Sequence, residues 1–252
     1  MPGSSEIRVA QDQEGWATEA ASLVHEIGAQ AVRDHGRFSL ALSGGTTPDR
    51  LYRTLVSPPF VDRFDWSRVI FFFSDERCVP PDHPESNYGL ANRALLRPLN
   101  VPAAQVHRMM GEASDPEQAA RDYEEQLRTT NQIASGLWPR IDLTLLGLGN
   151  DGHTASLFPG TTAVDECRRW VTVGHAPSGP PRRLTLTLGV INRSTVVVFL
   201  VTGAGKARIV KTILEPSTDA DRRLPAALVK PEQGRLIWLL DPAASAELAE
   251  SR

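Results

Sequence analysis

The sequence predicts an α/β fold in which a mostly parallel sheet lies between two layers of helices. Short apolar runs rich in Val, Leu, Ile and Phe, typical of strands buried on both faces, alternate with longer segments of helical periodicity. Several of these runs end in glycine-rich turns, as strands do where they lead into a helix. We therefore expect a three-layer α/β/α, Rossmann-like architecture. Its predicted strands are residues 38–42, 69–73, 141–146, 183–188, 196–201 and 236–240.

Apolar side chains at helical spacing predict the helices between these strands. In residues 12–34, Trp16, Leu23 and Ile27 belong to one apolar stripe that would pack on the sheet. The Ala- and Glu-rich tail after Asp241 is expected to be helical or frayed. The other predicted helices run to about residue 56 and over residues 87–96, 116–133 and 206–214.

Composition limits the classes of function. No Ser/Gly-rich linker divides the 252 residues, so we expect one domain, residues 1–252. The net charge of −3, with both signs interspersed, gives no support to binding of nucleic acid or an anionic membrane. No apolar run is long enough to span a bilayer and no signal pattern begins the chain, which predicts a cytoplasmic protein. Cys78 and Cys167 fit neither a disulfide framework nor a zinc site and are interpreted as packing residues.

The first glycine-rich turn follows the strand 38–42 and reads Ser43-Gly44-Gly45-Thr46-Thr47-Pro48. Hydroxyl residues are candidate N-caps, and Pro48 suits a first helical turn. Backbone N–H groups at the start of a helix bind phosphate, so Ser43, Gly44, Gly45 and Thr46 are candidate ligands. The turn also nearly matches the G-x-S-x-G elbow of hydrolases, but Ala41 breaks that pattern, and a capping serine explains Ser43 without a catalytic triad.

Charged residues follow the strand 69–73, in the sequence Ser74-Asp75-Glu76-Arg77 at the start of a proline-rich loop. Charges gathered at a strand's end indicate a loop that faces substrate. Asp75 and Arg77 are the candidates for contact with it. Asp82 and His83 lack a further His or Cys at ligating spacing, so no metal is expected there.

The central motif comes directly after the strand 141–146 and contains Gly147, Gly149, Asp151, Gly152 and His153. It matches G-x-G-x-x-G, but Asp151 would place a negative charge against a pyrophosphate, and the nearby Pro159 leaves room for a short helix only. A nucleotide site is therefore disfavoured. Instead, we expect the glycines to expose N–H groups beside His153, with His153 in the first turn of the following helix.

A last glycine-rich turn, Thr202-Gly203-Ala204-Gly205-Lys206, follows the strand 196–201. It is similar to the end of a P-loop, but Leu200 and Ala207 stand where the first glycine and the magnesium-binding hydroxyl would be. An ATP site is therefore not expected. Lys206 can still bind a phosphate as a point charge.

Together these motifs resemble the 6-phosphogluconolactonases of the sugar-phosphate isomerase/deaminase-like superfamily. The matching segments are SGGTTP at 43–48, SDERCVP at 74–80, SNY at 86–88, GLGNDGHTASLFPG at 147–160 and TGAGK at 202–206. They occur in the family's order between residue 39 and about residue 240. Related glucosamine-6-phosphate deaminases carry a glutamate five residues after the histidine, where this chain has Phe158.

The resemblance implies metal-independent hydrolysis of 6-phospho-D-glucono-1,5-lactone to 6-phosphogluconate, in the oxidative pentose phosphate pathway. His153 would be the general base, because an imidazole titrates near neutral pH, and Asp151 would orient it. Backbone groups around Gly149 would stabilise the oxyanion. The family's arginine before a Thr/Leu strand matches Arg183, with Arg182 as a competitor, and Arg183 and Lys206 would complete the phosphate clamp.

We expect no cofactor and no metal, because Asp151 and His153 supply at most two of the three protein ligands that a catalytic zinc needs. The expected partner is a small phosphosugar lactone, and the expected assembly is a monomer or a small homo-oligomer. Two alternatives stay open: a glucosamine-6-phosphate deaminase-like enzyme and a non-catalytic sugar-phosphate sensor.

Overall fold

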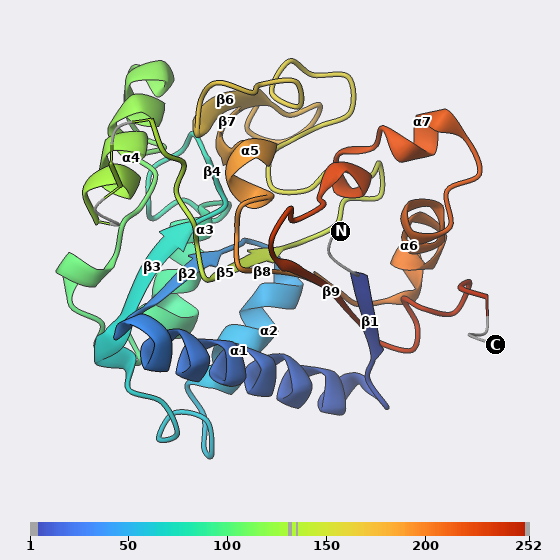
Figure 1. Cartoon of the computed structure of the whole chain (residues 1–252), viewed down its shortest axis with the longest axis horizontal. Helices are drawn as coiled ribbons and strands as arrows, with labels where there is room; N and C mark the ends of the chain where they lie inside the picture. The colour runs from blue at the N-terminus through green and yellow to red at the C-terminus, as the bar shows by residue number, and fades with distance from the viewer. Residues whose placement is uncertain (1–4, 131–132, 135, 250–252) are drawn as a thin grey trace.

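The computed structural model describes residues 5–130, 133–134 and 136–249, and a six-stranded parallel sheet forms its centre (Figure 1). The strand order is β1-β9-β8-β5-β2-β3, and every neighbouring pair is parallel. Because β3 lies on one side of β2 and β5 on the other, the order of the strands reverses between β2 and β5. The strands are β1 (Ser5–Val9), β2 (Phe38–Leu42), β3 (Val69–Phe73), β5 (Leu143–Leu146), β8 (Val196–Val201) and β9 (Arg235–Leu240).

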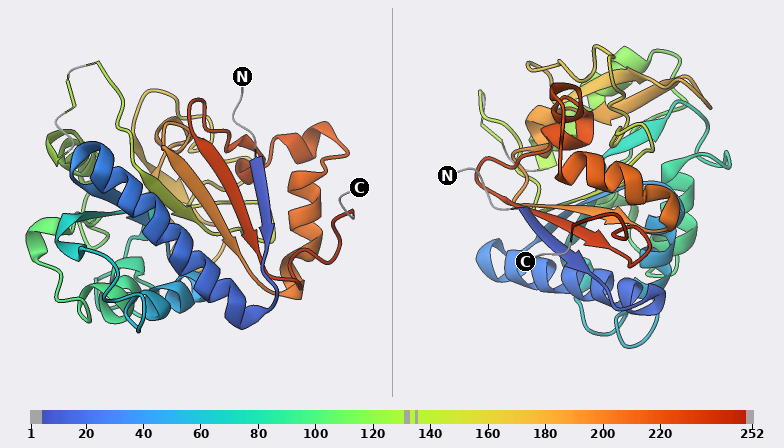
Figure 2. Two further views of the ribbon diagram at one scale, coloured as in Figure 1. Left: turned by 60° about the horizontal axis from the view of Figure 1, so that its bottom comes forward. Right: turned by 90° about the vertical axis from the view of Figure 1, so that its right-hand side faces the viewer.

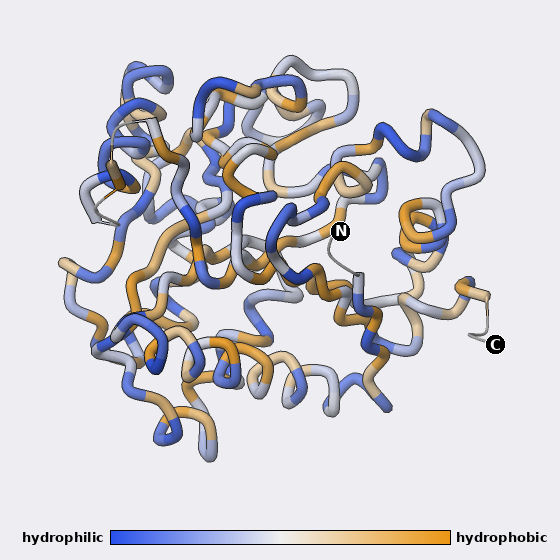
Figure 3. Tube along the Cα trace, viewed as in Figure 1, coloured by the Kyte–Doolittle hydropathy of each residue, from blue (hydrophilic) through white to orange (hydrophobic). Residues whose placement is uncertain are grey.

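Helices cover both faces of this sheet, which confirms the predicted three-layer arrangement (Figure 2). Successive strand residues point to opposite faces, so Leu40 and Leu42 pack in one apolar core while Ala41 packs in the other. Figure 3 shows hydrophobic residues concentrated along the central strands. The first core holds α1 (Gln13–His35), α2 (Thr46–Leu55) and α3 (Asn87–Ala91), and the second holds α4 (Pro116–Thr130), α5 (Leu188–Ile191) and α6 (Ala207–Leu214).

The long helix α1 has well-defined ends. The side chain of Asp12 accepts a hydrogen bond of 2.7 Å from the N–H of Gly15, and Gly36 ends the helix in the left-handed conformation, with φ of 79°. Such caps satisfy backbone groups that a helix leaves unpaired at its ends. The indole N–H of Trp16 donates to the carbonyl of Leu239, which fixes the helix on β9.

A second, antiparallel sheet lies on the α4 side of the molecule, in the order β4-β7-β6. It consists of β4 (Asp75–Arg77), β7 (Arg182–Leu186) and β6 (Val171–His175). Ser74 joins the two sheets, because its N–H donates to the carbonyl of Leu42 and its carbonyl accepts from the N–H of Leu186. The prediction of a loop at Asp75–Arg77 is therefore wrong: these residues pair with β7, in a strand too short to give a period-2 pattern.

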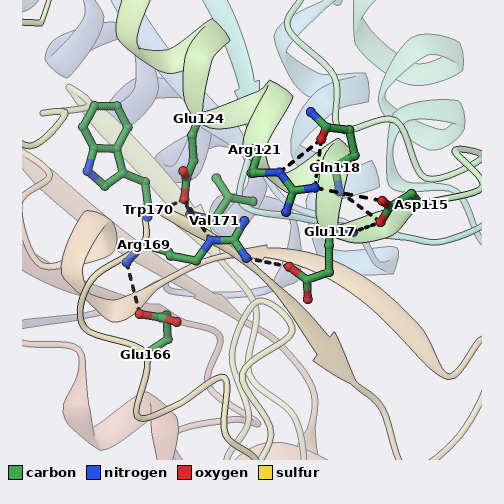
Figure 4. A network of polar contacts seen from close by, with 9 residues as sticks. All are labelled: Asp115, Glu117, Gln118, Arg121, Glu124, Glu166, Arg169, Trp170 and Val171. Atoms are coloured by element: carbon green, nitrogen blue, oxygen red, sulfur yellow. Dashed lines mark hydrogen bonds and ion pairs between the residues drawn. The ribbon is translucent and has the colours of Figure 1, made fainter.

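Polar contacts fasten this second sheet to α4 (Figure 4). The carboxylate of Glu124, on α4, accepts hydrogen bonds from the N–H groups of Trp170 and Val171 at 2.8 and 3.0 Å. Arg169 donates to Glu117 at 2.6 Å, and Glu166 accepts from the backbone of Arg169. Figure 4 shows that these side chains come from α4 and from the segment that leads into β6.

Other differences from the predicted elements are local. The predicted helix 87–96 consists of α3 and a continuing π-helix, Asn92–Leu96. The tail after Asp241 forms turns up to residue 249, since Asp241 accepts from the N–H of Ala244 and folds the chain back. The cysteines are not both packed, because Cys167 is exposed and Cys78 is half-buried. The far end of the predicted helix 116–133 includes residues 131–132, which lie outside the described ones.

None of the helices within residues 5–130, 133–134 and 136–249 has the length and apolar character needed to cross a bilayer.

Candidate active site

A cavity of about 210 Å³ opens at the carboxyl ends of the parallel strands, next to the point where the strand order reverses. In open α/β sheets this position binds ligands, because the loops on either side separate there. Loops after β2, β5 and β8 form one side of the cavity, and β4 with the start of α3 forms the other. Its lining residues are Ser43, Gly44, Asp75, Arg77, Asn87, Gly147, Leu148, Gly149, His153, Ala155 and Lys206.

His153 and Asp151 form a hydrogen-bonded pair at the rim. The Nδ1 atom of His153 lies 2.6 Å from Oδ1 of Asp151, and the same oxygen accepts from the backbone N–H of His153 at 3.1 Å. Burial raises the pKa of Asp151, but the hydrogen bonds and the charge of His153 outweigh it, so this pKa lies below its ordinary value. Asp151 itself does not line the cavity. It binds the Nδ1 side of the imidazole from outside the cavity.

Gly149 makes room for this imidazole. A Cβ atom at residue 149 would lie 2.0 Å from Nδ1 of His153 and 2.6 Å from Oδ1 of Asp151, so no larger residue fits. The N–H of Gly149 also donates to the carbonyl of His153 at 2.9 Å, which closes the turn. No helix starts directly after Gly152, so the prediction that His153 lies in a first helical turn is wrong. Instead Thr154 donates to the carbonyl of Gly147 and pairs with Leu157 in an isolated bridge.

The Ser43 loop leads into α2. Tyr52 holds its backbone, because the phenol hydroxyl donates to the carbonyl of Ser43 at 2.7 Å and accepts from its N–H at 3.0 Å. The Oγ of Ser43 is buried and has no hydrogen-bond partner among the described residues. The N-cap of α2 is Gly45, with φ of 106°, so the prediction of a hydroxyl N-cap is wrong. With no capping side chain, the first N–H groups of α2, beginning at Thr46, are available to a ligand.

Lys206 enters from the loop after β8. Its ammonium donates to Oδ1 of Asn150 at 2.7 Å. Burial lowers the pKa of Lys206, and the nearby charge of Asp151 offsets only part of this effect. The loop is anchored by the buried carboxylate of Asp241, which accepts from the N–H of Gly203 at 3.0 Å. Lys206 therefore brings a partly desolvated cation to the cavity.

Asp75 and Arg77 lie two residues apart on β4, and both line the cavity. Both carboxylate oxygens of Asp75 are engaged, by the hydroxyl of Ser156 at 2.6 Å and the amide of Asn87 at 3.0 Å. Arg77 donates to the carbonyl of Glu85 at 2.6 Å, while its buried Nε has no partner among the described residues. A cavity that already holds an unbound guanidinium N–H and a hydroxyl suits an anionic, hydroxylated ligand.

The structure separates Arg182 from Arg183. Arg182 is exposed, whereas Arg183 is only 6% exposed and donates to the carbonyls of Pro180 and Ser178. Burial lowers the pKa of the Arg183 guanidinium, and the adjacent Arg77 lowers it further. Arg183 does not line the cavity, nor do Gly45 and Thr46.

Asn87, Gly147, Leu148 and Ala155 line the cavity but were not among the residues predicted as ligands. For Asn87 a signal was present, since it belongs to the segment SNY that carries part of the resemblance. Within the described part of the chain, no group of three or more His, Cys, Asp or Glu side chains is placed to hold a metal ion.

Comparisons with known proteins show which family the chain is similar to. The family described as glucosamine-6-phosphate isomerases/6-phosphogluconolactonase matches residues 11–238. A 6-phosphogluconolactonase from Synechocystis is 44% identical over 87% of this chain and 88% of its own, and one from Rattus norvegicus is 40% identical over 97% and 94%. The solved 6-phosphogluconolactonase from Trypanosoma cruzi superposes with a TM-score of 0.84, at 32% identity, over 99% of this chain and 98% of that one.

Proposed function

The chain belongs to the glucosamine-6-phosphate isomerase/6-phosphogluconolactonase family, and we propose that it hydrolyses 6-phospho-D-glucono-1,5-lactone to 6-phosphogluconate in the oxidative pentose phosphate pathway. The observation that carries this proposal is the His153–Asp151 pair on a cavity whose other charged groups include Arg77 and Lys206. A general base beside cations is what hydrolysis of a phosphorylated ester requires.

His153 acts as the general base in this proposal. Its Nε2 takes a proton from water as the water oxygen bonds to C1 of the lactone, and the carbonyl oxygen becomes an oxyanion. Backbone N–H groups of the glycine-rich turn stabilise that charge, other than the N–H of Gly149, which already donates to the carbonyl of His153. The bond between C1 and the ring oxygen then breaks, and the imidazolium returns its proton to that oxygen. The product is the open-chain acid with a hydroxyl at C5.

Phosphate recognition falls to the cations and to the free end of α2. Lys206 supplies a point charge, and the N–H groups around Gly44, Gly45 and Thr46 supply donors. Arg183, although behind the cavity wall, adds to the positive potential beside Arg77. Asp75 and Ser43 contact the hydroxyl groups of the sugar in this proposal.

Phe158 favours the lactonase over the deaminase alternative. Its ring lies 4.3 Å from the ring of His153, centroid to centroid, where the deaminases carry a glutamate. An apolar ring cannot relay a proton, which supports ester hydrolysis over ring opening. Nε of Arg77 and Oγ of Ser43 have no hydrogen-bond partner among the described residues, which favours the binding of a substrate beside them. The His153–Asp151 pair argues against a sensor without turnover.

We also propose that residues 1–252 act as one domain, because both sheets contribute to the cavity, and that a single chain is catalytically complete. A monomer or a small homo-oligomer fits this equally. A cytoplasmic location is consistent with two cysteines that form no disulfide.

The decisive assay compares turnover of 6-phospho-D-glucono-1,5-lactone, glucosamine 6-phosphate and unphosphorylated gluconolactone by the purified protein. Fast hydrolysis of the phosphorylated lactone, with no ammonia from glucosamine 6-phosphate, is expected. Ammonia release would establish the deaminase activity, and binding without turnover of either substrate would establish the sensor.

A further inference from the structure

The side-chain amide of Asn87 is held in one orientation. Asn87 is 2% exposed, and its Nδ2 donates both to the backbone carbonyl of Asp75 at 2.9 Å and to the carboxylate of Asp75 at 3.0 Å. If the amide were flipped, its oxygen would face two acceptor oxygens and lose both hydrogen bonds. Asp75 therefore fixes which end of the amide points away from β4.

The Oδ1 atom of the Asn87 amide points at the Ser43 loop, next to Gly44. A Cβ atom on Gly44 would lie 1.7 Å from Oδ1 of Asn87, so only glycine at residue 44 leaves the oxygen in place. Both Gly44 and Asn87 line the cavity. No described residue donates a hydrogen bond to this oxygen, and it is not one of the fully buried side-chain atoms that lack a partner, so a ligand in the cavity can reach it. The amide thus presents an acceptor, and no donor, to a ligand.

The backbone that carries Asn87 is fixed as well. The buried carboxylate of Glu76 accepts from the N–H groups of Arg77, Asn87 and Tyr88 and from the hydroxyl of Ser86, at 2.7, 2.7, 2.8 and 3.0 Å. Burial raises the pKa of Glu76, and these donors counteract the rise. Ser156 holds Asp75 from the opposite side. The acceptor oxygen is therefore preorganised and does not have to turn when ligand binds.

We infer that Asn87 is a specificity-determining residue, whose Oδ1 accepts a hydrogen bond from one ring hydroxyl of the sugar-phosphate lactone. The inference rests on the proposed function. Of the substrate's groups, the phosphate and the lactone carbonyl carry only acceptors at neutral to alkaline pH, and an amide oxygen repels them. The hydroxyls at C2, C3 and C4 are the only donors on the ring. A preorganised acceptor rejects an analogue that lacks its hydroxyl, because the oxygen is then covered by the ligand and left without a partner.

The test uses the phosphorylated lactone and its three analogues that lack the hydroxyl at C2, C3 or C4. For each enzyme variant, kcat/KM on each analogue is divided by kcat/KM on the parent lactone. We expect the wild type to disfavour the analogue that lacks the hydroxyl bound by Asn87 by about 10- to 100-fold, the cost of leaving a desolvated acceptor without a partner. In Asn87→Ala the discrimination against that analogue should disappear, and discrimination against the other two should persist.

Each ratio compares two substrates on the same enzyme variant. A lower fraction of folded protein changes both kcat/KM values equally and therefore cancels. Asn192→Ala is the matched control: its amide, too, bonds two backbone groups, those of Leu228 and Lys230, but it does not line the cavity. It should leave all three ratios at their wild-type values. A uniform loss on every substrate in Asn87→Ala, with the ratios unchanged, would overturn the inference and make Asn87 purely structural. No turnover of the parent lactone by the wild type would instead refute the proposed function.

Discussion

The Nδ1 atom of His153 donates to Oδ1 of Asp151 over 2.6 Å, so the lone pair of the imidazole is on Nε2. A carboxylate can only accept, and the lowered pKa of Asp151 keeps it ionised. The nitrogen that remains is therefore the one able to take a proton from water. Phe158 packs on the ring and restricts its rotation.

His153→Ala should lower the catalysed rate by roughly 10²- to 10⁴-fold, the range for losing a general base. Binding of 6-phosphogluconate should largely survive, because the cations of the cavity remain. The assay must subtract the spontaneous hydrolysis of the lactone. A variant with a nearly wild-type rate would remove His153 from the mechanism.

Gly149→Ala should inactivate the enzyme by displacing the imidazole. The new methyl group would lie 2.0 Å from Nδ1 of His153, so the ring or the turn must move. The control variant is Gly205→Ala, in the loop after β8, which does not line the cavity and where a Cβ meets no atom within 4 Å. Rates and melting temperatures of both variants should be measured. The steric explanation fails if the two substitutions lower the rate equally.

Lys206→Ala should raise KM for the phosphorylated lactone and leave the slow rate on unphosphorylated gluconolactone nearly unchanged. A hydrogen bond to a charged group contributes about 1.5 to 3 kcal/mol, or about 10- to 150-fold in affinity. Lys211→Ala, which removes an exposed lysine paired with Glu215 on α6, should affect neither substrate. Equal losses on both substrates in Lys206→Ala would indicate damage to the fold.

Binding of 6-phosphogluconate at alkaline pH should take up protons. Burial lowers the pKa of Lys206 below the ordinary value of 10.5, so between the lowered pKa and 10.5 much of the free enzyme carries a neutral amine. A bound phosphate, fully ionised above its own pKa of about 6, favours the ammonium and raises the pKa again. Calorimetric titrations in two buffers of different ionisation enthalpy measure the uptake. Lys206→Ala should abolish it, and uptake that persists in this variant would assign it to another group.

Prolonged treatment with EDTA should leave the activity unchanged, because Asp151 and His153 provide too few ligands for a catalytic zinc. Activity before and after chelation, and after added Zn²⁺, is the measurement. Loss on chelation with recovery on Zn²⁺ would replace the general-base mechanism by a metal-hydroxide one.

The periodicity of the sequence predicted the large elements, since the central strands and α1 bury a regular apolar pattern over several residues. It did not predict β1, β4 or β6, and β1 and β4 show two reasons. In β1, exposed Ile7 and Val9 alternate with the charged Glu6 and Arg8 at the edge of the sheet, and β4 has only three residues. Both become strands because a partner, β9 or β7, is available in space.

The glycine-rich loops located most of the cavity, because each follows a predicted strand at the same end of the sheet. Two features depended on the three-dimensional packing. Asn87 reaches the cavity because Glu76 binds the start of α3. Arg183 is buried because its position in β7 faces inward, opposite to that of Arg182. Neither relation is encoded within one segment of the chain.

The two sheets contribute different walls of the cavity, which bears on how such an enzyme diverges. His153 and Lys206 lie on loops that follow strands of the parallel sheet, whereas Asp75, Arg77 and Asn87 lie on β4 and α3. Ser74 joins β4 to the parallel sheet. The second sheet is held against α4 by Glu124 and Arg169, neither of which lines the cavity (Figure 4). Substitutions of Glu124 or Arg169 are expected to shift the second sheet relative to the parallel sheet, while every residue that lines the cavity stays the same. New substrate preferences are therefore accessible to evolution, and to engineering, through positions that no comparison of active-site residues would single out.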